Sequence, residues 1–281
     1  MFRTFIFITA ITLFFLGCEE YMDMDFTGES SGSLVVEGGI TTDSVAPRIV
    51  LTMSGDFFSK KPPVPVTNAI VTITDGQEIF PLYESGNGVY NAAPGVKGIA
   101  GNTYKLSIYL GDTAYYEASQ TIQPLPDMDS IRFENSSGFD MYKGIVQGYK
   151  VLYYGTEPQG VGDYYLWLLY LNDKLYTDSL YKKVFTSDEF MDGSYLHDYK
   201  LFIIPAEDLP TDTVVVRLEM RSVSKEYYDY ATGLMLETHW KGTPWDGPPA
   251  NAKGNVSNDA LGFFTAEDVK TISKLLIKDK K

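Results

Sequence analysis

The chain has 281 residues, with 37 acidic and 23 basic side chains and a formal net charge of −14 at pH 7. This excess of carboxylates disfavours binding to nucleic acid, which requires clustered Lys and Arg, and disfavours attraction to anionic lipid. The hydrophobic content of 44% predicts a globular chain with a full core, and a single cysteine excludes an internal disulfide and a cysteine metal cluster.

Residues 1–17 are expected to be a signal peptide. Arg3 precedes an apolar run over residues 5–16, which is shorter than the about 20 apolar residues of a stable membrane-spanning helix. The following FLGC, residues 15–18, resembles a bacterial lipobox, although Leu is usual where Phe15 stands. We therefore expect cleavage before Cys18, attachment of a diacylglycerol to Cys18 and, as is common, a third acyl chain on its new amine, with palmitate among these chains. The alternative is a hydrophobic first element that ends in a chance cysteine.

The next segment, residues 18–32, is acidic and then rich in Ser and Gly, with no strand or helix period. Such a composition predicts a flexible tether between a lipid anchor and the first folded domain.

Residues 33–122 show about seven short strand patterns separated by turn residues, which is typical of an immunoglobulin-like β-sandwich. Thr103–Leu110 alternates most clearly. The Cys…Trp…Cys pattern of antibody domains is missing, which favours a fibronectin-like or prealbumin-like sandwich. The patterns cover Leu34–Glu37, Arg48–Met53, Ala69–Thr74, Glu78–Tyr83, Gly88–Asn91, Thr103–Leu110 and Ala114–Ile122.

Residues 123–130, with two prolines and two aspartates, are a predicted linker to a second β-rich domain over 131–281. Tyr164–Leu171 is nearly all large and apolar, which predicts a strand covered on both faces by a second sheet or a helix. The other strands are predicted at Gly144–Tyr154, Lys174–Val184, Tyr199–Ile204 and Thr213–Ser222.

One α-helix is predicted near residues 223–237, with Ser222 or Ser224 as its cap and an apolar stripe along one side. The long Gly/Pro/Asn segment that follows contains Trp240 and Trp245. These two rings are a candidate platform for a sugar, a peptide or a partner protein, or else they pin the loop against the domain.

No catalytic, metal or cofactor pattern is found, so we predict a protein that is not an enzyme, with no metal and no cofactor. His197 and His239 are not at ligand spacing, and no nucleophile elbow occurs. Paired carboxylates for glycoside hydrolysis stay an open alternative, because a sequence does not give their separation.

Five Asp-Ser/Thr-apolar triplets resemble the O-glycosylation sequon that Bacteroidetes use on exported proteins. The alternative is that Asp ends a turn and the next residues begin a strand, which all-β chains repeat. The candidate hydroxyls are Ser44, Thr113, Ser130, Ser179 and Thr213.

Several blocks of the chain are similar in content and order to a Bacteroidetes outer-membrane lipoprotein family, the domain of unknown function 4249. In that family the last block often has two glycines where Asp259-Ala260 stands here. The blocks are LVVEGGITTD (34–43), SGDFF (54–58), NAIVTITDG (68–76), GVY (88–90), GNTYKLSIYLGDTAYYEASQTI (101–122), SKEYYDY (224–230) and PPANAKGNVSNDALGFFTA (248–266).

The resemblance implies an outer-membrane lipoprotein, often encoded beside TonB-dependent transporters, and implies no catalytic residue. Acids after the lipidated cysteine resemble a signal for export to the cell surface. The leading hypothesis is a non-enzymatic accessory or ligand-capture partner of a transporter. The alternatives are a surface adhesin or glycan- or peptide-binding module and, third, a surface hydrolase. The candidate export residues are Glu19, Glu20, Asp23 and Asp25.

Overall fold

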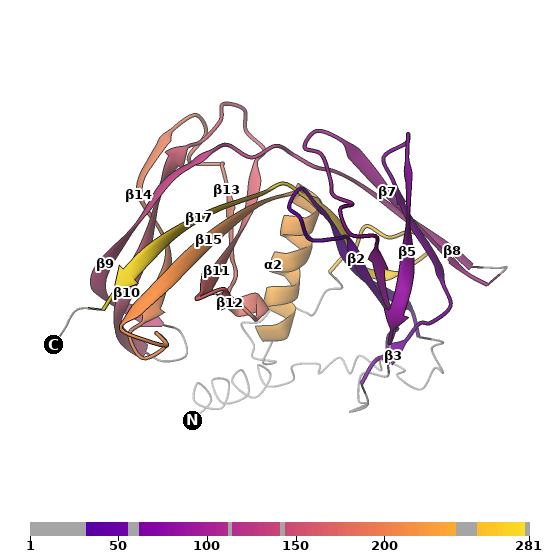
Figure 1. Ribbon diagram of the computed structural model, residues 1–281, viewed down its shortest axis with the longest axis horizontal. Helices are drawn as coiled ribbons and strands as arrows, with labels where there is room; N and C mark the ends of the chain where they lie inside the picture. The colour runs from indigo at the N-terminus through magenta and orange to yellow at the C-terminus, as the bar shows by residue number, and fades with distance from the viewer. Residues whose placement is uncertain (1–31, 56–61, 112–113, 141–143, 240–251, 279–281) are drawn as a thin grey trace, which may run out of the picture. The chain divides into compact units, whose positions relative to one another are not determined.

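The chain folds mainly as β-strands, as predicted (Figure 1). A computed structural model describes residues 32–55, 62–111, 114–140, 144–239 and 252–278. Within these ranges there is a single α-helix, α2 (Lys225–His239). All of them belong to one compact unit that begins at Gly32.

A nine-stranded sheet, called the first sheet below, is built from eight strands between residues 34 and 121 and from one later strand, β16. Its hydrogen-bonded order is β16-β1-β2-β6-β5-β4-β7-β8, and β3 pairs with β2. The strands are β1 (Leu34–Thr41), β2 (Arg48–Met53), β3 (Val64–Pro65), β4 (Ile70–Thr74), β5 (Ile79–Gly86), β6 (Val89–Ala92), β7 (Thr103–Leu110), β8 (Ala114–Thr121) and β16 (Leu261–Glu267).

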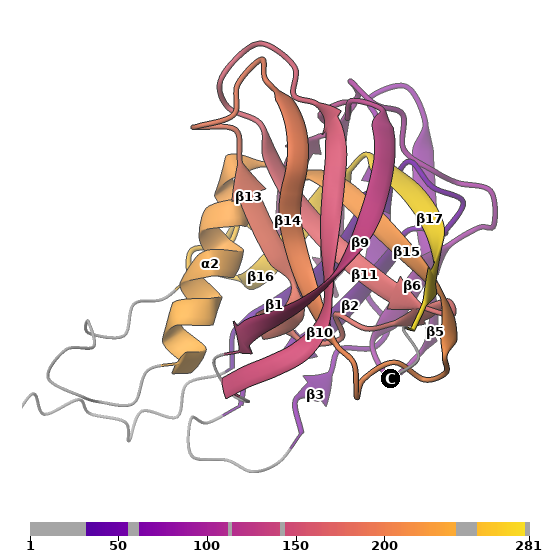
Figure 2. The same cartoon turned by 90° about the vertical axis from the view of Figure 1, so that its left-hand side faces the viewer.

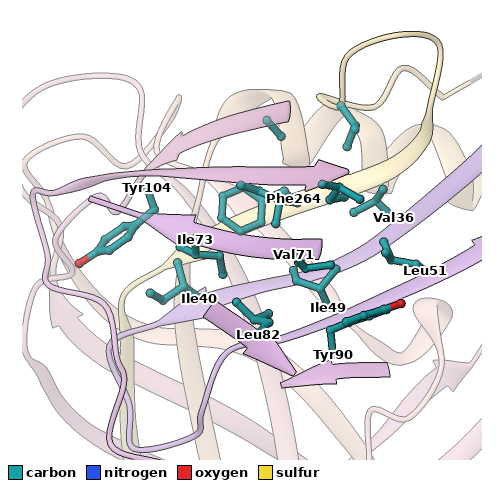
Figure 3. Packing of buried hydrophobic residues seen from close by; sticks show 14 of the residues in the cluster. Val36, Ile40, Ile49, Leu51, Val71, Ile73, Leu82, Tyr90, Tyr104 and Phe264 are labelled. Atoms are coloured by element: carbon teal, nitrogen blue, oxygen red, sulfur yellow. The ribbon is translucent and has the colours of Figure 1, made fainter. Parts of the chain in front are cut away.

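The alternation predicted for β7 is confirmed, because Tyr104, Leu106 and Ile108 are at most 1% exposed. Side chains on the same face of the neighbouring strands, such as Val71 and Ile73 on β4, pack with them in one core. Figure 3 shows the ring of Phe264, from β16, among these side chains, and Phe264 has no exposed surface. A residue close to the C-terminus therefore completes the core of the first sheet.

β16 lies parallel to β1, with Val36 opposite Gly262. Gly262 has φ +89°, and a Cβ there would lie 2.0 Å from the carbonyl oxygen of Val36, so only glycine fits. The sequence predicted residues 261–267 to belong to the second domain, which begins at residue 131, whereas they pair with a strand of the first sheet. The two strands are more than 200 residues apart in the chain, and no local pattern indicates such a pairing.

The remaining strands form two sheets, ordered β14-β10-β9 and β12-β11-β15-β17, with β13 paired to β11 (Figure 2). Side chains from both sheets build one core around Trp167, which is 1% exposed. The strands are β9 (Met128–Asp140), β10 (Gly144–Thr156), β11 (Tyr164–Leu171), β12 (Lys174–Leu175), β13 (Val184–Ser187), β14 (Tyr195–Pro205), β15 (Thr213–Val223) and β17 (Val269–Ile277).

β11 is buried on both faces, as its sequence predicted. Trp167 and Leu169 point into the core between the two sheets, and Leu166 and Leu168 pack on the other face with rings from α2. Figure 1 shows α2 beside this strand. Ser224 is the helix cap, because its Oγ accepts the Tyr227 N–H at 3.2 Å.

Two expectations about elements were wrong. Residues 174–184 are not one strand: after β12 the chain forms a short 3₁₀ helix, η1 (Leu180–Lys182), and then β13. The chain leaves the sheet because the N–H groups of Tyr176 and Thr177 both bond the Leu169 carbonyl. The predicted linker ends earlier, since β9 begins at Met128. In addition, β3, β9 and β17 were not predicted as strands.

The first sheet is joined to the others where β16 passes into β17, at Asp268, which is 8% exposed. Its carboxylate accepts the Thr42 hydroxyl at 2.6 Å and the Leu125 N–H at 2.8 Å. Its own N–H donates to the Ser222 hydroxyl at 2.9 Å. This Asp268 junction therefore holds the end of β1, the 123–127 segment and the end of β15 together.

Beside the junction, the Arg221 guanidinium lies between two buried carboxylates. It contacts Glu219 at 2.6 Å and Glu267 at 2.9 Å, and these carboxylates are 5% and 4% exposed. The two acids raise the pKa of Arg221, although burial opposes this. Because Glu267 belongs to β16 and Glu219 to β15, the arginine links the sheets electrostatically.

Candidate functional sites

Three carboxylates meet where the loop between β10 and β11 contacts the turn after β13. Glu157 follows the last residue of β10, Asp163 precedes β11 and Asp188 follows β13. One carboxylate oxygen from each lies within 4.8 Å of the other two. We call these residues the acid cluster.

The acid cluster is held by backbone and hydroxyl donors. The Gly162 N–H donates to both oxygens of Asp188, at 2.8 and 3.1 Å, and the Tyr165 hydroxyl donates to Glu157. The Asp188 N–H donates to the Asp163 carbonyl at 3.1 Å. Glu157 and Asp188 are only 3% and 1% exposed. Buried carboxylates so close together repel one another, so this arrangement is electrostatically costly.

Burial is the largest cause of the raised pKa of Glu157, and repulsion from Asp163 and Asp188 adds to it, while the Tyr165 hydrogen bond opposes it. Burial also raises the pKa of Asp163, and Asp188 contributes to that shift. The pKa of Tyr165 is raised by burial and by its bond to Glu157.

Oxygen ligands of this kind suit a hard cation such as Ca²⁺, and three carboxylates from two adjoining loops could hold one. The sequence alone did not indicate the cluster, because Glu157 and Asp163 lie 6 residues apart, Asp163 and Asp188 lie 25 apart, and these spacings match no EF-hand. Only the pairing of β11 with β13 brings Asp163 next to Asp188. No local pattern could have found it.

The same two loops expose apolar side chains. Phe190 is 92% exposed and Val161 is 74% exposed. The loops are bonded to each other, because the Gly160 N–H donates to Asp192 at 2.7 Å and the Gly193 N–H donates to the Pro158 carbonyl at 3.0 Å. We call Val161 and Phe190 the apolar tip. Exposed aromatic side chains on fixed loops are typical of contacts with partners.

A second polar group lies on the outer side of β9, β10 and β14. Asp198, in a bulged part of β14, has φ +55° and accepts hydrogen bonds from Arg132, at 2.7 Å, and from Tyr154. The hydrogen bond from Tyr154 and then that from Arg132 lower the pKa of Asp198. His197 lies at 3.0 Å from its carboxylate. The group ties three strands together, and His197, as predicted, is a surface histidine with a 70% exposed side chain.

The structure describes four of the five candidate glycosylation hydroxyls. Ser44, Ser130 and Thr213 are exposed, and Ser179 is half-buried at the start of η1. Asp43 accepts the Val45 N–H, which forms a turn around Ser44. Both interpretations of the triplets, glycosylation and turn chemistry, fit these positions.

The other predicted site residues lie outside the described residues, and so does the fifth hydroxyl. They are Cys18, Glu19, Glu20, Asp23, Asp25, Thr113, Trp240 and Trp245. His239 is the last residue of α2. In the part of the chain that the structure describes, no helix has the length and apolar character needed to span a bilayer.

The fold defines a class of mainly β protein in which a C-terminal strand completes the first sheet and a buried acidic junction joins the sheets. A family model described as "Domain of unknown function (DUF4249)" matches residues 19–273. The chain belongs to this family, which confirms the resemblance found in the sequence. No curated protein matches the chain.

Proposed function

We propose that this protein is a lipid-anchored outer-membrane protein without enzymatic activity, which acts as an accessory or ligand-capture partner of a TonB-dependent transporter. The observation that carries the proposal is the lipobox-like FLGC at residues 15–18. The family match supports it by beginning at Glu19, the residue after the proposed anchor.

The distance between anchor and body suits this role. Fifteen residues, 19–33, separate Cys18 from the first strand, which begins at Leu34. A chain of that length spans at most about 50 Å when fully extended and about 20 Å on average when flexible. The body would therefore stay near the membrane, within reach of a protein embedded in it.

The described contacts support a binding role more than a catalytic one. The Asp268 junction and Arg221 link the sheets, so exposed loops are presented on a stiff body. The acid cluster brings carboxylates together, but Glu157 and Asp188 are buried and offer a sugar little access. This disfavours the surface-hydrolase alternative.

The anchor is tested by replacing Cys18 with Ser. Wild-type protein should incorporate labelled palmitate and sediment with the outer membrane, whereas Cys18→Ser should do neither. Ser31→Ala, in the predicted tether, is the matched control and should behave as wild type. Equal palmitate incorporation by wild type and Cys18→Ser would exclude the anchor.

The partner is tested by affinity purification from solubilised outer membranes. We expect a TonB-dependent transporter to co-purify, and we expect Phe190→Ala with Val161→Ala to weaken its recovery by removing the apolar tip. Val45→Ala, which is 66% exposed on the β1–β2 turn, is the control. If wild-type protein recovers no transporter, the accessory role is wrong.

The alternative is a surface adhesin or glycan- or peptide-binding module that uses Trp240 and Trp245. The exposed tyrosines of the first sheet favour a binding module, since 65% of Tyr83 is accessible. Glycan-array binding that is lost in Trp245→Ala without loss of folding would support the tryptophan site.

A further inference from the structure

Four strands of the first sheet present a row of large side chains to solvent, which we call the tyrosine row: Tyr83 on β5, Ile70 on β4, Tyr109 on β7 and Tyr115 on β8. Ile70 lies opposite Tyr109, and Tyr109 opposite Tyr115. The pairing of Val71 with Leu82 places Ile70 beside Tyr83. The register therefore aligns four side chains across neighbouring strands.

These side chains are accessible because their strand neighbours face the core. Tyr83, Ile70 and Tyr109 are 65%, 66% and 45% exposed, and Tyr115 is half-buried. The rings of Tyr109 and Tyr115 lie 4.7 Å apart, centroid to centroid, at 40°. Strands are spaced about 4.8 Å apart, so the row extends for about 14 Å.

Hydrogen-bonding groups lie along the row. In the next register position, Ser107 lies opposite Thr72 and Glu117. The Tyr115 hydroxyl donates to Glu117 at 2.6 Å and lies 3.4 Å from the Ser107 hydroxyl. Ring faces bordered by hydroxyl and carboxylate groups are the combination that a sugar requires, because its C–H face stacks on a ring while its hydroxyls bond alongside.

The charge of the surface around the tyrosine row favours a neutral ligand over a charged one. On the face of the row, the four strands carry Lys105 and Glu117, which pair at 2.6 Å. This face is therefore neutral, whereas the chain has a net charge of −14. A strongly charged ligand would find no complementary charge here, whereas a neutral ligand does not require one.

The exposed area of the tyrosine row is too small for a stable interface with a second protein. From the exposed fractions, the row offers about 400 Å² if a large side chain has roughly 200 Å². A stable protein interface needs about 800 Å² from each partner. The row is too small for that and is large enough for a few sugar units.

We propose that the tyrosine row is a binding site for a neutral, extended oligosaccharide. This names a ligand class for the ligand-capture part of the proposed function and rests on that part. Glycan binding can be measured on purified full-length protein, without a membrane or a transporter, so its failure is distinguishable from failure of anchoring or of partner recovery.

The test uses short linear neutral oligosaccharides, namely cello-, malto-, xylo- and manno-oligosaccharides, titrated calorimetrically against the full-length protein. At least one series should bind, and Tyr83→Ala and Tyr109→Ala should each weaken it by about tenfold or more. Tyr195→Ala, at a residue that is 55% exposed on β14, is the matched control and should bind as wild type. Circular dichroism and the urea midpoint should stay unchanged in all three variants.

Three outcomes would overturn the proposal. One is that no series binds at millimolar concentration, and another is that binding persists in both row variants. The third is self-association, or capture of a protein, that Tyr109→Ala abolishes while no glycan binds, since this would assign the row to a protein interface.

Discussion

Replacing Asp268 with Ala should destabilise the protein strongly, because one buried carboxylate serves two donors from distant segments. The Leu125 N–H, in a residue that is 6% exposed, would lose its acceptor, and so would the Thr42 hydroxyl. A hydrogen bond to a charged group contributes about 1.5–3 kcal/mol, and part of the Thr42 loss is recovered by water. We expect a loss of about 2–5 kcal/mol in the free energy of unfolding.

The measurement is urea unfolding followed by fluorescence, with thermal unfolding beside it. For a chain of this size, that loss should lower Tm by about 5–15 °C. Asp268→Asn should cost less, because its oxygen can accept from Leu125 while its amide donates to the Thr42 hydroxyl.

The control is Asp127→Ala. Asp127 also bonds across the segments, to Lys270 at 2.5 Å, but its side chain is 93% exposed. An exposed ion pair contributes little, so a change within about 0.5 kcal/mol is expected. If Asp268→Ala and Asp127→Ala unfold at the same urea concentration, the Asp268 junction does not stabilise the fold and the reasoning is refuted.

Glu157→Gln should raise stability at pH 7. Burial raises the pKa of Glu157 in the folded state. The protonated side chain therefore contributes fully to stability below the pKa of the unfolded state, and this contribution is lost as pH rises through the pKa of the folded state. The urea midpoints of wild type and Glu157→Gln should converge at pH 4 and separate at pH 7. Arg221→Met should cost about 3–5 kcal/mol in urea unfolding, because Glu267 would be left buried without its cationic partner and Glu219 would keep only Arg217. A neutral result would contradict this. Ser224→Ala should cost about 1 kcal/mol by loss of the helix cap, and a thermal midpoint equal to wild type would show that the cap contributes nothing.

The elements that the sequence predicted well are those whose burial follows a local period. β7 and β11 have the predicted bounds, because the alternation of Tyr104, Leu106 and Ile108 and the unbroken apolar run around Trp167 each report the surroundings of their own strand. The helix α2 was predicted from its capping serine, which in the structure is Ser224, and from the apolar stripe along one of its sides. In each case, side chains near in sequence carry the whole signal.

The remaining features depend on pairing between distant segments. Nothing in Leu261–Glu267 indicates a partner in β1, and the acid cluster forms only when β13 pairs with β11. The tyrosine row depends on register, since Ile70 and Tyr109 are neighbours only through the alignment of β4 with β7. A single sequence does not give the register between distant strands, so these sites become evident only in the three-dimensional structure.

The position of β16 has a consequence for the order in which the chain is made. A ribosome releases β1 first, but the strand that lies beside it, and the Phe264 ring in the middle of its core, come more than 200 residues later. The first sheet therefore cannot be completed until Glu267 has been made. Until then one edge of β1 stays unpaired, and an exposed strand edge of this kind is prone to pair with other chains.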